Sequence, residues 1–381
     1  MRVLVVNAGS SSLKLRLLGD HDELLSGAEL EAPDSRFDKG ELREALNSGL
    51  GRADAVGHRI VHGGERYRSA VRIDPDVERT LRQLADLAPL HQAKSLAALD
   101  AVSAALPDVP AVACFDTAFH ATLPAAAATY ALPRAWRERW GLLRYGFHGL
   151  SHAWVARRVP ELLGRETIGL RIVSAHLGAG ASLCAIADGA SCDTTMGFTP
   201  LEGLVMSTRS GTVDPGMLLW LLEHEQLSPG ELADSLEHRA GLLGLCGTAD
   251  MEELLRRVAR DDASARLALE VYVHRLRASI GAMTASLGGV DVLVFTGGVG
   301  ERSAQVRGLT AQGLEFLGVE IDEQRNRDAE GDRNISAHGS TVATLAIEAR
   351  EDLEIARQVR AALDCQRAAS GGTGRRHERD R

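Results

Sequence analysis

A short turn of small residues near the amino terminus carries the first recognisable chemistry in this chain. Residues 3–6 form an apolar run that predicts a buried strand, residues 7–12 predict a tight turn, and residues 13–18 predict a returning strand. Backbone N–H groups and hydroxyls in such a turn can bind an anion, and Lys14 adds a positive charge beside it. The segment predicts a phosphate-binding hairpin, and an ordinary hairpin with a polar turn is the alternative.

The same pattern returns in the second half of the chain. An apolar strand at 171–176 leads into the turn Gly178-Ala179-Gly180 and then into a second apolar strand at 182–187. A third glycine-rich turn, at 297–301, follows a strand and precedes a helix, and it would allow a ring or a sugar to approach the backbone. Two hairpins, one opening each half, predict a duplicated fold that holds a polyphosphate from both sides of a cleft.

The elements that position these turns predict a mixed α/β protein. Apolar runs predict strands at 3–6, 53–61, 110–116, 171–176, 182–187, 291–296 and 341–347. Helical periodicity is clearest at 75–86, 91–105, 150–163, 215–224, 250–260, 263–287 and 351–363. From residue 367 the chain is rich in glycine and charge without apolar periodicity, which predicts a disordered tail over 367–381.

Composition limits the class of protein. A chain of 381 residues with 45% hydrophobic and 25% charged residues predicts a globular protein of two domains. No apolar run is long enough to span a bilayer and no signal-peptide pattern opens the chain, so we expect a cytoplasmic protein without a membrane partner. Five cysteines without a CxxC pair predict reduced thiols, and the net charge of −9 argues against nucleic-acid binding.

Several familiar signatures are absent or weak. The chain contains no GxxxxGK[ST], which excludes a Walker-type P-loop, and Gly178-Ala179-Gly180 lacks the third glycine of a dinucleotide-binding motif. His148 and His152 are four residues apart and would share a helix face, but no further ligand pattern supports zinc. For His152 we expect a core histidine with satisfied hydrogen bonds.

Seven blocks of the chain, in order, resemble the acetate kinase family. They are VVNAGSSSLK at 5–14, GHRIVHGG at 57–64, FDTAFH at 115–120, RYGFHGLSH at 144–152, MGFTPLEGL at 196–204, TRSGTVDPG at 208–216 and FTGGVGE at 295–301. The resemblance implies two duplicated ribonuclease H-like (actin-like ATPase) α/β domains with a nucleotide cleft between them. It places residues 1–120 and 352–366 in the amino-terminal domain and residues 121–351 in the second domain.

The resemblance also implies a reaction, the reversible transfer of the γ-phosphoryl group of ATP to acetate, giving acetyl phosphate and ADP. Such a transfer needs positioning and charge neutralisation more than covalent help. Arg59 and Arg209 would bind the anionic groups, and His148 would donate a hydrogen bond to the transferring phosphoryl group. Asp116 would orient Arg59 or a metal-bound water, because acetate is already ionised near neutral pH and needs no general base.

Further roles follow from the same resemblance. Asn7 and Glu351 match positions associated with Mg²⁺, which Mn²⁺ could replace, although a helix N-terminus also favours a glutamate such as Glu351. The expected nucleotide contacts are Ser10, Ser12, Lys14, His176, Leu177, Gly178, Ala179, Gly180, Asp250, Met251, Glu252, Gly298, Val299, Gly300, Glu301 and Arg302. The pocket for the acyl methyl group would be lined by Val61, Leu90, Phe147 and Pro200.

Some positions depart from the family pattern. Ala179 stands where the family usually has Asn, residues 346–350 replace a more usual Pro-Thr-Asn pattern, and Glu252 and Arg302 replace other polar groups near the adenosine. The alternatives to an acetate kinase are a propionate or butyrate kinase and a catalytically weak nucleotide-binding sensor of the same fold. The family further implies a homodimer and metabolic coupling to phosphate acetyltransferase.

Overall fold

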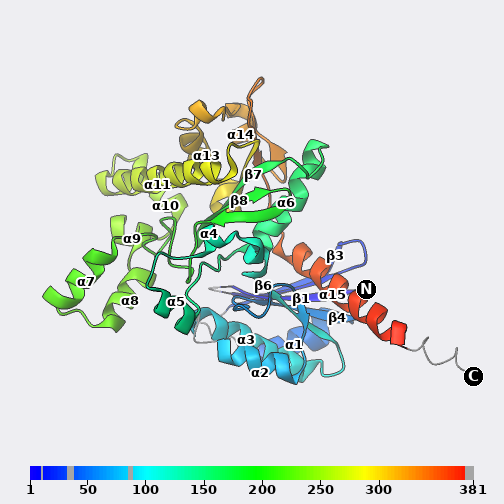
Figure 1. Ribbon diagram of the computed structural model, residues 1–381. Coiled ribbons are helices and arrows are strands. Elements are labelled where there is room, and N and C mark those ends of the chain that lie inside the picture. The colour runs from blue at the N-terminus through cyan, green and yellow to red at the C-terminus, as the bar shows by residue number, and fades with distance from the viewer. Residues whose placement is uncertain (10–11, 32–37, 85–88, 374–381) are drawn as a thin grey trace, which may run out of the picture. The chain divides into compact units, whose positions relative to one another are not determined.

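The computed structural model describes residues 1–9, 12–31, 38–84 and 89–373, and the chain divides into two compact units. The first unit comprises Met1–Phe119 and Arg350–Arg381, and the second unit comprises His120–Ala349. A short 3₁₀ helix, η4 (Ala118–Thr122), spans the boundary in sequence. Each unit is built on its own six-stranded sheet (Figure 1).

The first sheet has the order β3-β2-β1-β4-β6-β5. Its strands are β1 (Val3–Ala8), β2 (Ser12–Leu18), β3 (Leu24–Glu31), β4 (Ala55–Ile60), β5 (Val71–Arg72) and β6 (Ala111–Phe115). The first three strands form an antiparallel meander, β1, β4 and β6 run parallel, and β5 is an antiparallel edge. Parallel neighbours bring the carboxyl ends of β4 and β6 to the same edge of the sheet.

The second sheet repeats this plan with the order β9-β8-β7-β10-β12-β11. Its strands are β7 (Arg171–Leu177), β8 (Ala181–Ala187), β9 (Ala190–Thr194), β10 (Val292–Thr296), β11 (Arg333–Asn334) and β12 (Ala343–Ala346). Here too a meander is followed by two parallel strands and an antiparallel edge. The matching order confirms the predicted duplication of an α/β fold.

Helices cover both faces of the first sheet. They are α1 (Lys39–Glu44), the π-helical turn η2 (Ala45–Gly49), α2 (Pro75–Gln83), α3 (Pro89–Ala105) and α15 (Glu351–Thr373). Leu4, Val6 and Val56 of the sheet pack with Ala98 and Val102 of α3 in one apolar core. The other face receives α15, shown in red in Figure 1. A Cβ on Gly57 would meet Ile355 of α15 at 2.6 Å, so this glycine permits the close packing.

The helices of the second unit are mostly shorter. They are α4 (Ala125–Ala128), α5 (Arg134–Trp140), α6 (Gly149–Leu163), α7 (Pro215–His224), α8 (Pro229–His238), α9 (Gly241–Cys246), α10 (Met251–Val258), α11 (Ala263–Leu287), α12 (Gly297–Arg302), α13 (Ala304–Ala311), η5 (Glu315–Leu317) and α14 (Glu323–Arg327). The long helix α11 packs against β7, β8 and β9, and α6 packs against β7. None of the helices in the described part of the chain combines the length and apolarity needed to cross a membrane.

Two sequence expectations differ from the structure. The disordered tail was expected from residue 367, but α15 continues to Thr373, because residues 366–369 have good helix propensity and extend a helix that is already formed. Residues 374–381 of that tail lie outside the described residues. The glycine-rich segment at 297–301 is itself the first part of α12 and not a turn before a helix.

Candidate active site

Arg59 and Asp116 form the centre of a polar cluster in the first unit. Arg59 lies near the carboxyl end of β4 and Asp116 directly follows β6, so the parallel pairing of these strands brings them together. Arg59 Nε donates to Asp116 Oδ1 at 3.2 Å, and Arg59 Nη2 donates to Asp116 Oδ2 at 2.5 Å. Both side chains are largely buried, with 14% and 1% of their surface exposed. The pair is a two-point ion pair, which fixes the plane of the guanidinium.

Asn7 and Glu351 complete this cluster. Asn7 lies near the end of β1, and its Nδ2 donates to Glu351 Oε2 at 3.0 Å. Arg59 Nε lies 3.8 Å from the same carboxylate oxygen, and Arg59 Nη1 donates to the Asn7 side-chain oxygen at 3.5 Å. Glu351 is the first residue of α15, as the sequence predicted. The structure therefore brings together four of the residues that the sequence analysis assigned to the site, Asn7, Arg59, Asp116 and Glu351.

In this cluster, burial disfavours the charged forms of Asp116 and Arg59, whereas the opposite charge of each partner favours them. Burial raises the pKa of Asp116 to about 6, and the charge of Arg59 opposes this rise. Burial also disfavours the charged guanidinium of Arg59, but the carboxylates of Asp116 and Glu351 outweigh it and raise the pKa of Arg59. The Arg59 pair needs the ionised Asp116 carboxyl, so the raised pKa moves the loss of this pair towards neutral pH.

The donor chemistry of this cluster fits a hard cation. Asn7, Asp116 and Glu351 supply only oxygen ligands, which Mg²⁺ prefers. In the described part of the chain no three His, Cys, Asp or Glu side chains gather as a metal-ligand group. Mg²⁺ commonly keeps several waters and uses one or two carboxylates together with substrate phosphates, so a small ligand set of this kind suits it.

The two strands of the hairpin that the sequence predicted in the first unit are present as β1 and β2, which pair antiparallel. Gly9 N donates to Ser12 O at 2.9 Å and closes the turn, while Ser10 lies outside the described residues. The Ser12 hydroxyl donates to Glu29 Oε1 at 2.7 Å, and Lys14 Nζ lies 3.7 Å from the same oxygen. Lys14 also pairs across the sheet with Asn7. Lys14 is therefore next to the polar cluster but forms an ion pair with a carboxylate.

Three histidines of the second unit, His148, His152 and His176, have their rings close together. His148 precedes α6 with a left-handed backbone, φ 56°, so it does not share a helix face with His152. His152 is fully buried, and both of its ring nitrogens have hydrogen-bond partners 2.9 Å away, the hydroxyls of Ser174 and Ser182. This confirms the expected core role of His152. The His148 ring stacks on that of His176, with centroids 4.3 Å apart.

Arg209 lies beside the glycine turn of this unit. Its Nη1 donates to the carbonyl oxygen of Pro200 at 3.3 Å, and its Nε lies 3.3 Å from Glu237. Burial lowers the pKa of Arg209, and Glu237 opposes that change. A Cβ placed on Gly180 would meet His148 Nε2 at 3.3 Å and Arg209 Nη1 at 3.4 Å. The structure thus gathers Arg209 and His148 at the turn that the sequence predicted to bind phosphate.

The turn itself repeats the first hairpin. Gly178 N donates to Gly180 O at 2.9 Å, and the strand residue before it, Leu177, is fully buried. The side chain of Ala179 is exposed, while its carbonyl oxygen accepts a hydrogen bond from Ser207 N at 3.2 Å. His176, on β7, contacts the Ser151 hydroxyl through Nδ1 at 2.8 Å. The turn is therefore anchored from both sides while its tip remains open.

The other predicted nucleotide contacts lie at the start of α10 and along α12. Asp250 caps α10, where Met251 is buried and the Glu252 side chain is 86% exposed. Gly298, Val299, Gly300, Glu301 and Arg302 form α12. A Cβ on Gly298 would meet Arg302 Nη2 at 2.7 Å, so this side chain lies over the glycine. Glu301 accepts a hydrogen bond from Ala349 N at 2.8 Å and so holds the segment after β12.

The residues expected to contact the acyl group are divided between the units. Val61 is buried in the first unit, and Phe147 is buried in the second. Pro200, also in the second unit, accepts a hydrogen bond from Arg209 at its carbonyl oxygen. Leu90 falls within α3, but its side chain lies outside the described residues.

Sequence reasoning missed a network that ties two of the quoted motifs together. Arg144 donates to the carbonyl oxygens of Thr194, Thr195 and Met196 at 3.1–3.2 Å and to Glu202 Oε1 at 2.8 Å. The Tyr130 hydroxyl donates to the other oxygen of Glu202 at 2.5 Å. Arg144 lies in the motif RYGFHGLSH and Glu202 lies in the motif MGFTPLEGL. Their place in these motifs is the sequence feature that could have indicated the network. The network fixes the loop that leads to Pro200.

Arg307 was also missed. It is 1% exposed, and its guanidinium donates to the carbonyl oxygens of Gly300 and Glu301 and to Asn326 at two points. These bonds hold the carboxyl end of α12, where helix carbonyls lack partners within the helix. Arg307 therefore supports the shape of the glycine-rich segment without belonging to any quoted motif.

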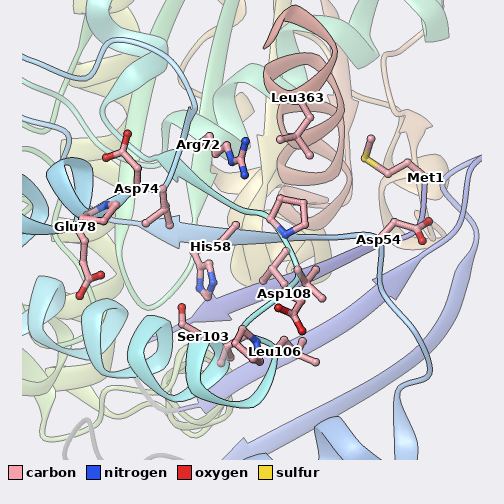
Figure 2. A pocket seen from close by; sticks show the side chains of 18 residues that line it. Met1, Asp54, His58, Arg72, Asp74, Glu78, Ser103, Leu106, Asp108 and Leu363 are labelled. Atoms are coloured by element: carbon pink, nitrogen blue, oxygen red, sulfur yellow. The ribbon is translucent and has the colours of Figure 1, made fainter. Parts of the chain in front are cut away.

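A cavity of about 830 Å³ opens on the first unit, away from the polar cluster around Arg59 and Asp116. Its lining includes Asp54 and Pro110, which precede β4 and β6, whereas Arg59 and Asp116 lie at the carboxyl ends of the same strands. Figure 2 shows that the ring of His58 in this cavity points towards the helix that carries Ser103. None of the predicted site residues lines it, so we do not assign the chemistry to this cavity.

Comparisons with known proteins agree with these features. The family model described as the acetokinase family matches residues 39–357. The acetate kinase of Gloeobacter violaceus is 43% identical over 94% of this chain and 98% of its own length, and that of Leifsonia xyli subsp. xyli is 45% identical over 93% and 97%.

Solved structures give the same result. The Porphyromonas gingivalis acetate kinase has a TM-score of 0.87 at 35% identity and covers 95% of this chain and 99% of its own. A propionate kinase from Francisella tularensis has a TM-score of 0.88 at 34% identity, with coverage of 94% and 99%. The predicted fold class is thereby confirmed. The family match and these relatives over nearly the whole length show that this chain belongs to the acetokinase family.

Proposed function

We propose that this protein is an acetate kinase, which transfers the γ-phosphoryl group of ATP to acetate and also catalyses the reverse reaction. The observation that carries the proposal is the two-point Arg59–Asp116 pair beside Asn7 and Glu351, in a chain of the acetokinase family. A buried, fixed guanidinium is suited to bind an oxyanion in one orientation. The second unit contributes His148 and Arg209 to the same reaction.

The proposed chemistry needs charge stabilisation and no proton removal. A carboxylate oxygen of acetate attacks the γ-phosphorus, and the bond from that phosphorus to the bridging oxygen of ADP breaks. Arg59 binds the acetate, while Arg209 and His148 stabilise the charge on the transferring phosphoryl oxygens. Asp116 acts through Arg59 and is a positioning residue, since its carboxylate already holds two guanidinium donors.

Asn7 and Glu351 would hold Mg²⁺ or Mn²⁺ through its waters. When bound, the cation supplies positive charge that neutralises the phosphate oxygens of ATP or ADP. The oxygen-only donor set of the cluster supports this assignment. Lys14 and the turn at 178–180 would bind the nucleotide phosphates, and α10 and α12 would contact its adenosine part.

The size of the acyl group follows from Val61, Leu90, Phe147 and Pro200. One methylene changes binding by about 1–3 kcal/mol, so we expect propionate to be a slower substrate that is still accepted. The propionate kinase of Francisella tularensis, at 34% identity, supports propionate as the alternative substrate. Comparing kcat/KM for acetate, propionate and butyrate tests this order.

The direct test is production of acetyl phosphate from ATP and acetate, trapped as the hydroxamate. We expect activity in the unaltered protein, a loss of at least about 100-fold in Arg59→Ala, and no loss in Arg79→Ala. Arg79 is a suitable control because it is exposed and pairs only with Asp76 on its own helix in the described residues. ATP binding without any acetyl phosphate would support the sensor alternative.

We also propose a homodimer, supplying acetyl phosphate to a phosphate acetyltransferase in the cytoplasm. Large apolar side chains on α7 support self-association, because Met217, Leu219 and Trp220 are 44–59% exposed. The free thiols of all five cysteines fit a reducing compartment. Light scattering of the protein and of Trp220→Glu tests the dimer, which the charge should weaken.

A further inference from the structure

A chain of three hydrogen bonds leads from His148 into the core of the second unit. His148 Nδ1 lies 2.9 Å from the Ser182 hydroxyl, the same hydroxyl lies 2.9 Å from His152 Nε2, and His152 Nδ1 lies 2.9 Å from the Ser174 hydroxyl. Ser174, Ser182 and His152 are fully buried. The topology explains the alignment, since Ser174 and Ser182 lie on neighbouring strands β7 and β8 and α6 carries His152 over them.

When both imidazoles are neutral, only two directions of this hydrogen-bond chain give the buried Ser182 proton an acceptor. A hydroxyl has one proton, so Ser182 can donate to only one of the two ring nitrogens that contact it. In one direction Ser182 donates to His148 Nδ1 and accepts from His152 Nε2, which leaves the His148 proton on Nε2. In the other direction His148 Nδ1 donates to Ser182, and Nε2 of His148 has no proton.

The buried end of the chain distinguishes these directions. Among the described residues, the Ser174 hydroxyl has His152 as its only hydrogen-bond partner. In the first direction Ser174 donates its proton to His152 Nδ1 and is satisfied. In the second it must accept from His152, and its own buried proton has no acceptor, which costs the desolvation of that O–H group. The first direction is therefore favoured.

His152 also has the charge state that this argument needs. Burial holds the pKa of His152 well below its ordinary value, and the neighbouring His120 and His176 lower it further. The ring is therefore neutral and has a single N–H, which it can give only to Ser182 or to Ser174. A charged His152 would donate on both sides and would leave the buried Ser174 proton without an acceptor among the described residues.

We propose that Ser174, His152 and Ser182 are positioning residues that hold His148 as the neutral tautomer with its proton on Nε2. His148 Nε2 points to the glycine turn, since a Cβ on Gly180 would meet it at 3.3 Å. An N–H there can donate to a phosphoryl oxygen, whereas a bare nitrogen would repel it. This inference rests on the proposed role of His148 in phosphoryl transfer, but the tautomer itself can be measured without activity.

The first experiment is ¹⁵N spectroscopy of the histidine-labelled protein, with His148→Gln used to assign the His148 signals. Protonated and bare ring nitrogens differ widely in chemical shift, so the spectrum reports the tautomer directly. We expect a bare Nδ1 and a protonated Nε2 in His148, and a shift towards a mixture in Ser174→Ala. A proton on Nδ1, or on both nitrogens, in the unaltered protein would overturn the proposal.

The second experiment is a double-mutant cycle on kcat. We expect Ser182→Ala to lower kcat about 10-fold and Ser174→Ala about 3-fold, with little change in KM, because Ser182→Ala removes two hydrogen bonds of the chain, one of them to His148, whereas Ser174→Ala removes one. In the His148→Gln background, where the amide N–H needs no tautomer, the same serine substitutions should change kcat less than about 2-fold. Equal losses in both backgrounds would show that the serines act only on the structure.

Ser191→Ala is the matched control. Ser191 is 1% exposed and bonds to a buried histidine, His120, at 2.9 Å, outside the chain that leads to His148. We expect it to leave kcat and the His148 spectrum unchanged. If the tautomer is as proposed but neither His148→Gln nor Ser182→Ala lowers kcat, the proposed role of His148 fails while the tautomer assignment stands.

Discussion

Arg59 is held by Asp116 at two points, from Nε to Oδ1 and from Nη2 to Oδ2. The carboxylate is 1% exposed and has both oxygens occupied by guanidinium protons. A carboxylate in this position orients a cation and is poorly placed to take a proton from a substrate. This geometry favours a positioning role for Asp116 over a role as general base.

We predict that Asp116→Asn lowers kcat by about 10²-fold or more, because the amide keeps the shape but loses the charge that fixes Arg59. Since burial raises the pKa of Asp116 to about 6, kcat/KM of the unaltered enzyme should fall as pH drops below 6, where the carboxyl takes up a proton. The residual activity of Asp116→Asn should lack this acidic limb. Asp76→Asn, at an exposed carboxylate paired with Arg79, serves as the control.

A rescue experiment separates the two roles of Asp116. In Asp116→Ala, small buffer bases should fail to restore the rate, whereas a raised Mg²⁺ concentration should recover a measurable fraction by supplying positive charge to the phosphates. Measuring acetyl phosphate formation across a series of base and Mg²⁺ concentrations gives the answer. Recovery with base and none with Mg²⁺ would return Asp116 to the role of general base.

Arg209→Ala should lower kcat much more than it raises KM for acetate. In the proposed role, the contact of Arg209 strengthens as charge spreads over the phosphoryl oxygens in the transition state, so removing Arg209 lowers mainly the rate. Steady-state kinetics with varied acetate and ATP measure the split. Arg239→Ala is the control, because Arg239 is exposed and pairs with Asp234. An unchanged kcat with a raised KM would leave Arg209 a role in substrate binding alone.

The sequence predicted the elements of the active site well where the signal was local. Strand, turn and strand in the two hairpins follow from runs of a few residues, and the pairing of β4 with β6 then brings Arg59 to Asp116. The strand order of each sheet needed the structure, because pairing between strands that are distant in sequence leaves no local pattern.

The residues that support the site were harder to predict from the sequence, because their contacts also join segments that are distant in sequence. Arg144, Glu202 and Tyr130 span 72 residues, and nothing in their neighbours indicates that one carboxylate joins an arginine to a tyrosine. Glycines at 297, 298 and 300 favour a turn by propensity. The structure makes this segment a helix, and the buried Arg307 binds the carbonyl oxygens at its end.

Ala179→Asn should lower the KM for ATP about 3-fold to 10-fold, since one solvent-exposed hydrogen bond from the amide is worth about 0.5–1.5 kcal/mol. The Ala179 side chain is exposed at the tip of the turn, so the amide fits without displacing a neighbour. ATP titrations at saturating acetate provide the measurement. An unchanged KM, or lost activity, would mean that the turn binds the phosphates through its backbone alone.

Gly146→Ala should destabilise the protein by about 1–3 kcal/mol more than Gly164→Ala does. Both glycines have left-handed backbones, with φ of 71° and 59°. A Cβ on Gly146 would meet His120 at 2.6 Å and Thr194 at 2.7 Å, whereas Gly164 has open space within 4 Å. The backbone strain of an alanine is therefore similar in the two variants. The difference between their urea midpoints then measures the steric clash of the new Cβ at position 146. Equal midpoints would show that the neighbours of Gly146 move aside easily.

The last prediction concerns His58, which lies beside the cavity of Figure 2 and has no catalytic assignment. His58 is 1% exposed, and neither ring nitrogen has a hydrogen-bond partner among the described residues. Burial lowers the pKa of His58 from its ordinary 6.5 to about 3. Between these values the unfolded chain binds a proton that the folded protein refuses, so stability falls as pH drops from 6.5 towards 3.

His58→Leu should remove this contribution. Near pH 8 the variant should equal or exceed the unaltered protein in stability, because an apolar side chain leaves no unpaired polar atom. At pH 5 its advantage should grow by about 2 kcal/mol, since one pKa unit corresponds to about 1.4 kcal/mol. Urea unfolding at both pH values measures the change. The other buried histidines are present in both proteins, so their pH-dependent contributions to stability cancel in the comparison. His338→Leu, at an exposed histidine, should show no such growth. If the advantage of His58→Leu is the same at pH 5 and pH 8, His58 accepts a proton in the folded protein and the assignment of a neutral, unpaired ring is wrong.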